Sequence, residues 1–461
     1  MFVAKELKKI GVESHFLSFS PHFSKKYLQE IEESWSHYPK DIFARKKGII
    51  STANSHSSEV ELSKYVLAMI KTDRVLKNWN IDSSISSLKR FSQWIDQLFT
   101  NQKFDLVICE STWTVERLIF ERAVANEVVY VTPTSTRYPP GCWFFSQDFN
   151  SREVSSTSPI VNLIDFHGSH LFGSGNYQLD THPTKLKKKS SKHLLPIIVE
   201  KLLVFGESKN NPTQRSFWDY LRFDSTLRIL LRRPIIKFLN FLLPKEFSGK
   251  EDFVFATFHV QPESSIDAMA PHVADQIDTF IRIANSLPSD WLLLIKDHPH
   301  GLGNRKLLDY AKLNKQHKIR LISSAANTSN FLARAKFTYT ATGTVAIEAS
   351  VAGGSVLLAT DTFFASLPGV FVHKEPWLFD WEGHASLEPL DLAARRRQCD
   401  TFFANLLSKC YKGVWASRRH SDFSVAEDNI RQIVDGIRNY LTQTNSKLSR
   451  VVEVNEKNEL T

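Results

Sequence analysis

The stretch KFTYTATGTVAIEASVAGGSVLLAT, residues 336–360, decides the fold class because it reads as strand, helix and strand in succession. An apolar, aromatic run ends at a Gly-Thr turn, the turn opens a helix, and Gly353 and Gly354 lead into a second apolar run. Two strands joined in this way by a helix form a βαβ unit with parallel strands. The stretch therefore predicts an α/β domain of the doubly wound type.

The same alternation continues on both sides of this unit. In the C-terminal half we expect strands at 251–260, 290–299 and 318–323 and helices at 275–288 and 328–335. In the N-terminal half, FDLVICES (104–111), TVERLIFERAVAN (114–126) and EVVYVTPTS (127–135) predict a second βαβ unit. Since a chain of 461 residues exceeds the usual size of one hydrophobic core, we expect two Rossmann-like doubly wound domains with a cleft between them.

The domain boundaries follow from changes in composition along the chain. We expect an N-terminal domain at 1–172, a basic and apolar interdomain region at 173–248, a nucleotide-binding domain at 249–420, a helix at 421–444 and a disordered tail at 445–461. The first helix, near 3–11, has no apolar strand before it, although a parallel sheet normally opens with one. A late start and a trimmed domain both remain open as explanations.

Composition limits the class of protein and of partner. The formal net charge is +9, which suits anionic partners such as nucleotides, acidic glycans or phospholipid head groups. The sequence contains no zinc finger, basic zipper or stacked-aromatic motif, so nothing in it indicates a nucleic acid as the partner. The four cysteines are far apart and fit reduced thiols, and neither a signal peptide nor a long apolar run is present. We therefore expect a cytoplasmic protein.

The sharpest local motif is DWLLLIKDHPH at 290–300. Its apolar run ends at Lys296, Asp297, His298 and Pro299, which places these residues at the carboxyl end of a predicted central strand. Lysine and histidine at that edge can bind phosphate oxygens, and proline stiffens the turn that presents them. A plain capped turn between strand and loop is the alternative interpretation.

The second motif is the Gly-Thr turn of the opening stretch. Thr342, Gly343 and Thr344 precede a helix, whose free N–H groups suit a phosphate, and Glu348 lies one turn further on, within reach of ribose hydroxyls. The alternative is a structural N-cap with a buried polar residue behind it. The GK[ST] sequence of a Walker loop is absent.

A third motif, FATFHVQPESS, places His259, Gln261, Pro262 and Glu263 after the first strand of the second domain. Ligands of doubly wound sheets bind at the carboxyl ends of the strands, so the three motifs together predict one nucleotide site.

A catalytic carboxylate is expected near this nucleotide site. Glu110 is the first candidate because it follows a strand that ends at the predicted cleft, and Asp148 and Glu263 are its competitors.

These motifs give the chain a family resemblance. HVQPESS, Gln276, SLPSDWLLLIKDHP and TATGTVAIEASVAGGSVLL resemble the capsule polysaccharide biosynthesis family of glycosyltransferases over about residues 250–370. A looser likeness covers 104–145, including the Glu116-Arg117 pair and TRYPPGCWFF. One departure is Asp297, where relatives often carry glutamate before the His-Pro pair.

The resemblance implies a GT-B architecture, and several members of the family transfer Kdo from CMP-Kdo. It implies that the His-Pro pair at 298–299 and the Gln-Pro pair at 261–262 lie near the nucleotide. It also implies that Gly343 and Thr344 contact the donor phosphate and that Glu348 contacts the nucleotide. On this basis the chain is expected to be a nucleotide-sugar-dependent glycosyltransferase that extends a glycan or lipid-linked acceptor of a capsular or surface polysaccharide.

Three alternatives remain at this stage. They are a teichoic-acid-type polyol-phosphate transferase with a CDP-activated donor, a sugar epimerase of similar fold, and a non-catalytic basic scaffold at a membrane. The first usually shows a TDYSS-like turn, whereas this chain has TATGTV. No DxD-like metal motif accompanies the predicted site, so we expect activity without a metal or other cofactor.

A further segment, Leu227–Lys245, mixes apolar residues with arginine and lysine. Such a segment can lie on an anionic membrane, which would place the protein peripherally on the inner face of the cytoplasmic membrane. The alternative is that its apolar residues pack between the two domains. Pro234 argues against one uninterrupted helix here.

Overall fold

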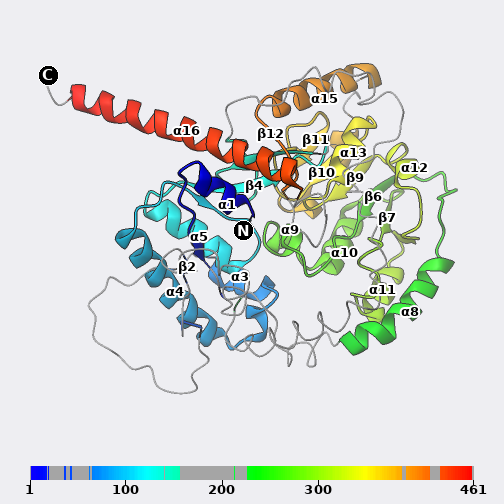
Figure 1. Cartoon of the computed structure of the whole chain (residues 1–461). Helices are drawn as coiled ribbons and strands as arrows, with labels where there is room; N and C mark the ends of the chain where they lie inside the picture. Colours follow the sequence, from blue (N-terminus) through cyan, green and yellow to red (C-terminus); the bar gives the residue numbers. More distant parts are fainter. Residues whose placement is uncertain are drawn as a thin grey trace.

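The structure is a computed structural model that describes residues 2–17, 19, 36–37, 42–43, 62, 65–139, 141–155, 212, 226–386, 391–415 and 426–458. Most of the expected interdomain region, 173–248, lies outside these residues. Figure 1 shows the arrangement of the helices and strands.

The largest sheet has six strands, all parallel, in the order β11-β10-β9-β6-β7-β8. Its strands are β6 (Phe253–Thr257), β7 (Leu292–Lys296), β8 (Ile319–Ile322), β9 (Phe337–Thr340), β10 (Ser355–Leu358) and β11 (Val370–Val372). When these strands are counted along the chain from one to six, the spatial order is 3-2-1-4-5-6, which is the order of the Rossmann fold. The α/β class and the parallel sheet expected from the sequence are confirmed.

Both faces of this sheet are buried, which explains the continuous apolar runs of its strands. Phe253 and Phe255 face a core that includes α13 (Val345–Val351) and α15 (Leu392–Leu407). Val254 and Ala256 face a second core, which contains α10 (Gln276–Ser286). Shorter helices complete the layers: α9 (Ser264–Asp267), α11 (Leu307–Asn314), α12 (Thr328–Leu332) and α14 (Trp381–Ala385). Helices on both faces make the sheet doubly wound.

A second sheet of four strands has the order β12-β5-β4-β3. Its strands β3 (Val107–Ile108) and β4 (Tyr130–Ser135) are parallel and are joined by α5 (Thr114–Ala125), so the βαβ unit expected here is confirmed. However, β5 (Cys142–Ser146) runs antiparallel to β4, and β12 (Tyr411–Lys412) runs antiparallel to β5. Helices α3 (Val66–Thr72) and α4 (Ile81–Asn101) and the short parallel pair β1 (Phe16–Leu17) and β2 (Ser36–His37) complete this part. The four-stranded sheet is therefore mixed.

The chain returns to the four-stranded sheet near its C-terminal end. Strand β12 pairs with β5, and α16 (Glu427–Asn458) packs beside α1 (Phe2–Lys9) over a core that contains Trp143 and Tyr411. The sequence had placed 411–412 in the nucleotide-binding domain, whereas these residues complete the other sheet. The helix also continues to Asn458 where a disordered tail from 445 was expected. The reason is local, because 445–458 contains neither glycine nor proline to end a helix.

The two sheets share a hydrophobic core. Tyr138, Cys142 and Phe144 belong to the same buried cluster as Phe253 and residues of α13 and α15. The ring of Tyr138 lies 5.1 Å from that of Phe403, and the ring of Phe144 lies 5.2 Å from that of Phe363. These contacts join the β4–β5 segment to the helix and the loop that pack on the six-stranded sheet.

Helix α8 (Thr226–Leu242) lies beside the six-stranded sheet and contains Pro234 in its interior (Figure 1). The expectation that this proline interrupts the helix is wrong. A proline removes one backbone hydrogen bond, and here both flanking segments remain helical. Among the described helices, none has the combination of length and apolar composition that a bilayer span requires.

Candidate functional site

The candidate site lies where the strand order of the six-stranded sheet reverses. From β6 the chain proceeds outward to β7 and β8, and then β9 returns to the other side of β6. The carboxyl ends of β6 and β9 therefore border the switch point at which such sheets bind their ligands. His259 follows β6, and Thr340 ends β9.

His259 and Thr340 are in direct contact across this point. His259 Nε2 lies 3.0 Å from Thr340 Oγ1 and accepts a hydrogen bond from the backbone N–H of Ala341 at 3.2 Å. Burial, together with the positive charge of Arg305, lowers the pKa of His259 to about 4. The imidazole is therefore neutral at pH 7, and its Nε2 acts as an acceptor that ties the two strand ends together.

The Gln261 amide holds the loop that follows β6. Gln276 accepts a hydrogen bond from the His259 N–H at 2.8 Å and donates one to Gln261 Oε1 at 2.6 Å. Gln261 in turn donates to Asp267 Oδ1 at 2.7 Å, while Pro262 is exposed. Both polar ends of the Gln261 amide thus bond to the protein, which gives this residue a structural part in shaping the site.

Lys296 is the last residue of β7, Glu348 lies in the first turn of α13, and the two side chains interact electrostatically. The Lys296 ammonium donates to the carbonyl of Ala326 at 2.7 Å and to Thr328 Oγ1 at 2.6 Å. Burial lowers the pKa of Lys296, and burial raises the pKa of Glu348, while the attraction between the two charges opposes both shifts. A lysine and a carboxylate from two different motifs therefore interact electrostatically, and a single nucleotide site that contains both stays a prediction.

Asp297, the next residue, belongs to a buried network. Its carboxylate accepts from Arg305 Nη1 at 2.9 Å, from the hydroxyl of Tyr310, and from the backbone N–H of His298 at 2.7 Å. Arg305 also donates to the backbone carbonyl of His259. The network therefore connects the end of β7 with the end of β6.

Neither Arg305 nor Tyr310 could be predicted from the sequence, because neither lies at a strand end or in a recognisable motif. Gln276 was part of the family resemblance, but without a role.

His298 and Pro299 are exposed at this edge. His298 Nδ1 accepts the backbone N–H of His300 at 3.2 Å, which leaves the proton of the neutral ring on Nε2. Partial burial lowers the pKa of His298, and His300 adds to this effect. At pH 7 the residue can therefore offer an N–H to an anion without carrying a full charge.

The Gly-Thr turn is closely packed. The Gly343 N–H donates to Thr340 Oγ1 at 3.0 Å, and a Cβ at this position would lie 2.5 Å from that oxygen. Thr342 donates its hydroxyl to the carbonyl of Ser265 at 2.9 Å, and Thr344 directly precedes α13. Only glycine fits at position 343, because any side chain would collide with Thr340.

The three candidate carboxylates lie in different surroundings. Glu110 is exposed after β3. Asp148 accepts backbone N–H groups of Asn150, Arg152 and Glu153 at 2.7 to 3.0 Å, so its carboxylate holds a turn together. Among the described contacts, no hydrogen bond or ion pair joins Glu110 or Asp148 to the His259 loop.

Glu263 lies in the loop that follows His259. Desolvation raises the pKa of Glu263, whereas Arg137, at the end of β4, lowers it electrostatically. Arg137 is exposed and has a φ of 62°, a left-handed conformation that is uncommon for a residue other than glycine. Glu263, itself exposed, is thus the candidate carboxylate that interacts electrostatically with a residue that follows a strand of the other sheet.

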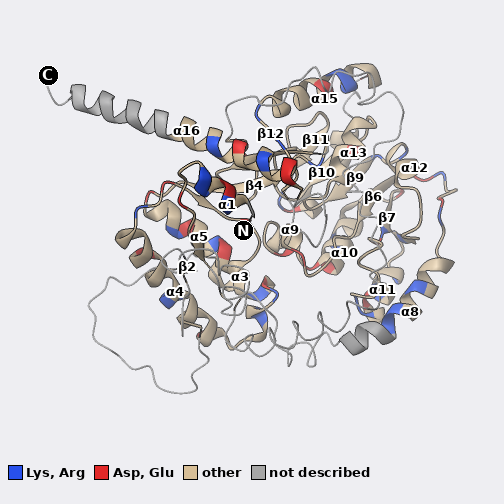
Figure 2. Ribbon diagram, viewed as in Figure 1, with Lys and Arg blue, Asp and Glu red and all other residues tan. Residues whose placement is uncertain are grey.

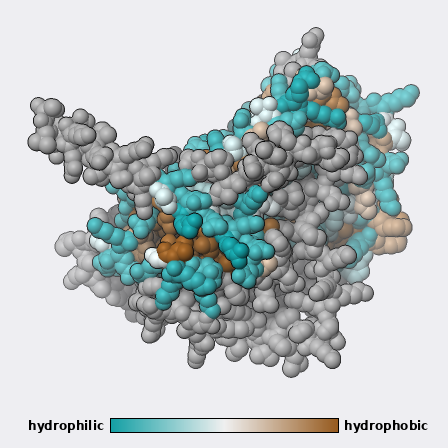
Figure 3. Space-filling model, turned by 45° about the horizontal axis from the view of Figure 1, so that its top comes forward, coloured by the Kyte–Doolittle hydropathy of each residue, from teal (hydrophilic) through white to brown (hydrophobic). Residues whose placement is uncertain are grey.

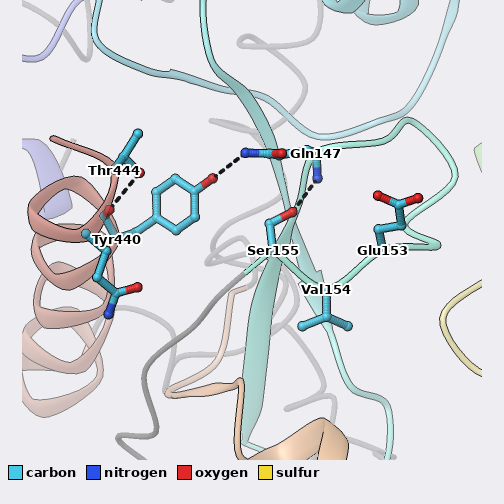
Figure 4. Close-up of a pocket in the computed structure, with 7 residues that line it drawn as sticks. Gln147, Glu153, Val154, Ser155, Tyr440 and Thr444 are labelled. Carbon is cyan, nitrogen blue, oxygen red and sulfur yellow. Dashed lines mark hydrogen bonds between the residues drawn. The ribbon is translucent and has the colours of Figure 1, made fainter. Parts of the chain in front are cut away.

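A small cavity lies within the candidate site, and a larger one lies elsewhere in the described structure. The one lined by His259, Gln276, Tyr339 and Ala341 holds about 10 Å³, enough for one water molecule. A larger one of about 290 Å³ lies between the loop after β5 and α16. Figure 4 shows this second cavity, where Tyr440 accepts a hydrogen bond from the Gln147 amide at 3.0 Å. The larger cavity contains none of the residues predicted for the nucleotide site.

Among the described residues, no group of three or more histidine, cysteine or acidic side chains could hold a metal ion.

Comparison with known proteins gives no family assignment. The sequence matches no protein-family profile and no curated protein. Among solved structures, the β-Kdo 2,7-transferase KpsC of Thermosulfurimonas dismutans is similar at 12% identity and a TM-score of 0.35, over 75% of this chain and 89% of that one. The UDP-GlcNAc 2-epimerase of Methanocaldococcus jannaschii is similar at 10% identity and a TM-score of 0.27, over 87% of this chain and 95% of that one. The α,α-trehalose 6-phosphate synthase of Burkholderia multivorans is similar at 12% identity and a TM-score of 0.30, over 84% of this chain and 80% of that one.

Proposed function

We propose that the chain is a glycosyltransferase that binds a nucleotide-activated sugar at the carboxyl edge of its six-stranded sheet. The observation that carries this proposal is the position of His259, Lys296 and Glu348 around the β6/β9 switch point of a sheet with Rossmann strand order. The edge offers the His298 Nε2–H and a lysine for phosphate and a carboxylate for ribose hydroxyls, whereas the N–H groups of Ala341 and Gly343 are bonded within the protein. The proposed acceptor is a glycan or a lipid-linked glycan of a capsular or other surface polysaccharide.

The proposed chemistry assigns each polar group a task. Departure of the sugar leaves negative charge on the nucleotide phosphate, which His298 Nε2–H and the Lys296 ammonium would stabilise. His259 stays neutral and keeps the Gly-Thr turn in place. Because these protein groups would neutralise the charge, we propose that no metal is required, and activity is expected to persist in EDTA. Loss of activity in EDTA with recovery on addition of Mg²⁺ would contradict this part of the proposal.

We propose Glu263 as the general base that removes the proton from the acceptor hydroxyl. Its raised pKa brings it closer to the pH at which a base accepts protons efficiently, and Arg137 opposite can hold an acidic or hydroxylated acceptor. The change Glu263→Gln should lower kcat by about 100-fold or more with little effect on donor affinity, since general bases contribute about 10² to 10⁴. The exposed Glu382→Gln is the matched control, and an equal kcat in both variants would exclude this role.

The identity of the donor is proposed from the family resemblance as CMP-Kdo. Calorimetric titration with CMP, CDP and UDP tests it directly. We expect CMP to bind the wild type, at least tenfold weaker binding by His298→Ala, and unchanged binding by the control His317→Ala, which removes an exposed histidine outside the site. Binding of UDP alone would reject the Kdo donor, and a preference for CDP would favour a polyol-phosphate transferase.

Product analysis separates transfer from the other possible activities. Purified protein is incubated with CMP-Kdo and candidate lipid-linked acceptors, and the product is examined by NMR. A new glycosidic linkage is expected. Conversion of the donor sugar without transfer would indicate an epimerase. Binding of none of the three nucleotides, together with absence of any product, would leave the non-catalytic scaffold as the better interpretation.

A further inference from the structure

Helix α8 has an apolar face that points away from the protein. The exposed side chains include Ile235 at 50%, Phe238 at 62%, Leu239 at 46% and Leu242 at 62%, which occupy positions i, i+3, i+4 and i+7. Phe241, beside them, is 70% exposed. A surface helix of a globular protein normally turns such a face toward the core and a polar face toward water. In α8 the wide apolar face is the outer one.

The inner face of α8 is narrow and firmly attached. Ile236 is 3% exposed, and Asn240, one turn later, donates to Ser324 Oγ at 3.0 Å and accepts the Ser324 N–H at 2.8 Å. Directly after the helix, the carbonyl of Pro244 accepts the N–H of Ser323 at 3.0 Å. These contacts attach α8 to the loop after β8 and thereby fix the rotation of the helix about its axis. Phe238 and Leu242, on the opposite face, therefore point outward.

Positive charge accompanies the apolar face. Arg233, Lys237 and Lys245 are exposed, and the sequence from 226 to 245 contains no aspartate or glutamate. Figure 2 shows Lys and Arg, and no acidic residue, along the described part of α8. Figure 3 shows a hydrophobic area at the right-hand edge of the molecule, the side on which α8 lies in Figure 1. The side chains of 226–231 lie outside the described residues.

We propose that α8 docks the protein on an anionic lipid bilayer, with its apolar face in the head-group region. Exposed aromatic and aliphatic side chains flanked by lysine and arginine are the features of helices that lie in the plane of an anionic membrane. The inference stands apart from the proposed activity, since it uses no residue of the nucleotide site. It deepens that proposal in one respect, because a lipid-linked acceptor would be met at the same surface.

Vesicle flotation with the full-length protein tests the docking. The wild type should float with vesicles of phosphatidylglycerol and phosphatidylcholine and remain at the bottom with phosphatidylcholine alone. An apolar-face variant (Ile235→Ser, Phe238→Ser, Phe241→Ser) should lose flotation. A charge variant (Arg233→Ser, Lys237→Ser, Lys245→Ser) should partition about a hundredfold more weakly, since each basic residue contributes about 1 kcal/mol near an anionic surface.

The matched control removes three exposed lysines elsewhere: Lys77→Ser, Lys89→Ser and Lys103→Ser. This control has the same net charge as the charge variant and should float like the wild type. Circular dichroism verifies that each variant is folded. Equal flotation of the charge variant and the control would overturn the proposal. So would a dimer in light scattering that the apolar-face variant abolishes while neither protein floats, because the face would then bind a second copy of the chain.

Discussion

His259 illustrates how a single buried side chain makes stability depend on pH. Its pKa in the folded protein is about 4, below the ordinary value of 6.5, so the unfolded chain binds this proton more readily. The stabilisation is present above pH 6.5 and is lost as the pH falls from 6.5 toward 4. Acidification therefore weakens the contact between the ends of β6 and β9.

We expect His259→Gln to flatten this part of the stability profile. The fall in the free energy of unfolding between pH 7 and pH 4 should be smaller than in the wild type by up to about 3 kcal/mol, because one titrating group has been removed. Urea unfolding at several pH values measures the free energy of unfolding in both proteins. His317→Gln, at an exposed histidine, should leave the slope as it is. Parallel profiles for wild type and His259→Gln would show that His259 is not buried as a neutral ring.

Arg305 is expected to matter for stability despite its absence from every sequence motif. Its side chain is 8% exposed and its partner Asp297 is 6% exposed, so Arg305→Ala would leave a buried carboxylate without its cation. The expected loss is about 3 to 5 kcal/mol in urea unfolding. The exposed pair of Arg431 and Glu427 provides the control, and Arg431→Ala should cost less than about 1 kcal/mol. Similar losses in the free energy of unfolding in both variants would show that burial does not strengthen the ion pair of Arg305 and Asp297.

At this scale the sequence predicts best those residues that directly follow a strand. Lys296 and the Gly343 turn could be predicted at the carboxyl edge of the sheet because parallel strands end there together, whereas their common role in a nucleotide site stays a prediction. Arg305 and Tyr310 could not, since their position depends on how the loop after β7 folds back. Asp148 was a plausible base from the sequence alone, and only the structure shows its carboxylate bonded to backbone N–H groups.

Among the elements, α16 approaches the four-stranded sheet very closely at Gly436. A Cβ at this position would lie 2.7 Å from the Trp143 ring and 3.0 Å from that of Tyr411. Glycine is unfavourable inside a helix by about 1 kcal/mol relative to alanine, so its presence here reflects the packing of helix against sheet.

We expect Gly436→Ala to destabilise the protein although alanine favours helices. Overpacking costs about 1 to 3 kcal/mol, which outweighs the gain in helix propensity. Thermal unfolding followed by circular dichroism should show a lower Tm for this variant. Thr442→Ala, on the exposed side of the same helix, should change the Tm little. A Tm raised by Gly436→Ala would mean that the helix does not pack so tightly.

The elements themselves follow well from sequence periodicity, because both faces of the six-stranded sheet are apolar and each strand ends in polar residues. Other elements were not predicted, among them α4, β5, β11 and α15, and two further features show why. Strand β12 has two residues, too few for any pattern, and its partner β5 is more than 260 residues away along the chain. Helix α8 continues past Pro234, although a proline inside a helix usually kinks or breaks it.

For the whole molecule, the shared core predicts that the two sheets unfold together. Phe144→Ala, at a fully buried ring of β5, should cost about 3 to 5 kcal/mol and lower the Tm of a single transition. Tryptophan fluorescence and circular dichroism should report the same midpoint, before and after the change. Two separate transitions, of which Phe144→Ala moves only one, would show that the sheets are energetically independent.

The pairing of β12 with β5 has a consequence for synthesis on the ribosome. Nascent chains generally fold from the N-terminus, domain by domain. Here the four-stranded sheet lacks its edge strand and the covering helix α16 until residues 411–458 have been translated. Until then, the apolar edge at Cys142–Ser146 stays available for pairing with other nascent chains. Translation speed and chaperone supply during expression should therefore affect the yield of this protein through β5, which waits longest for its partner.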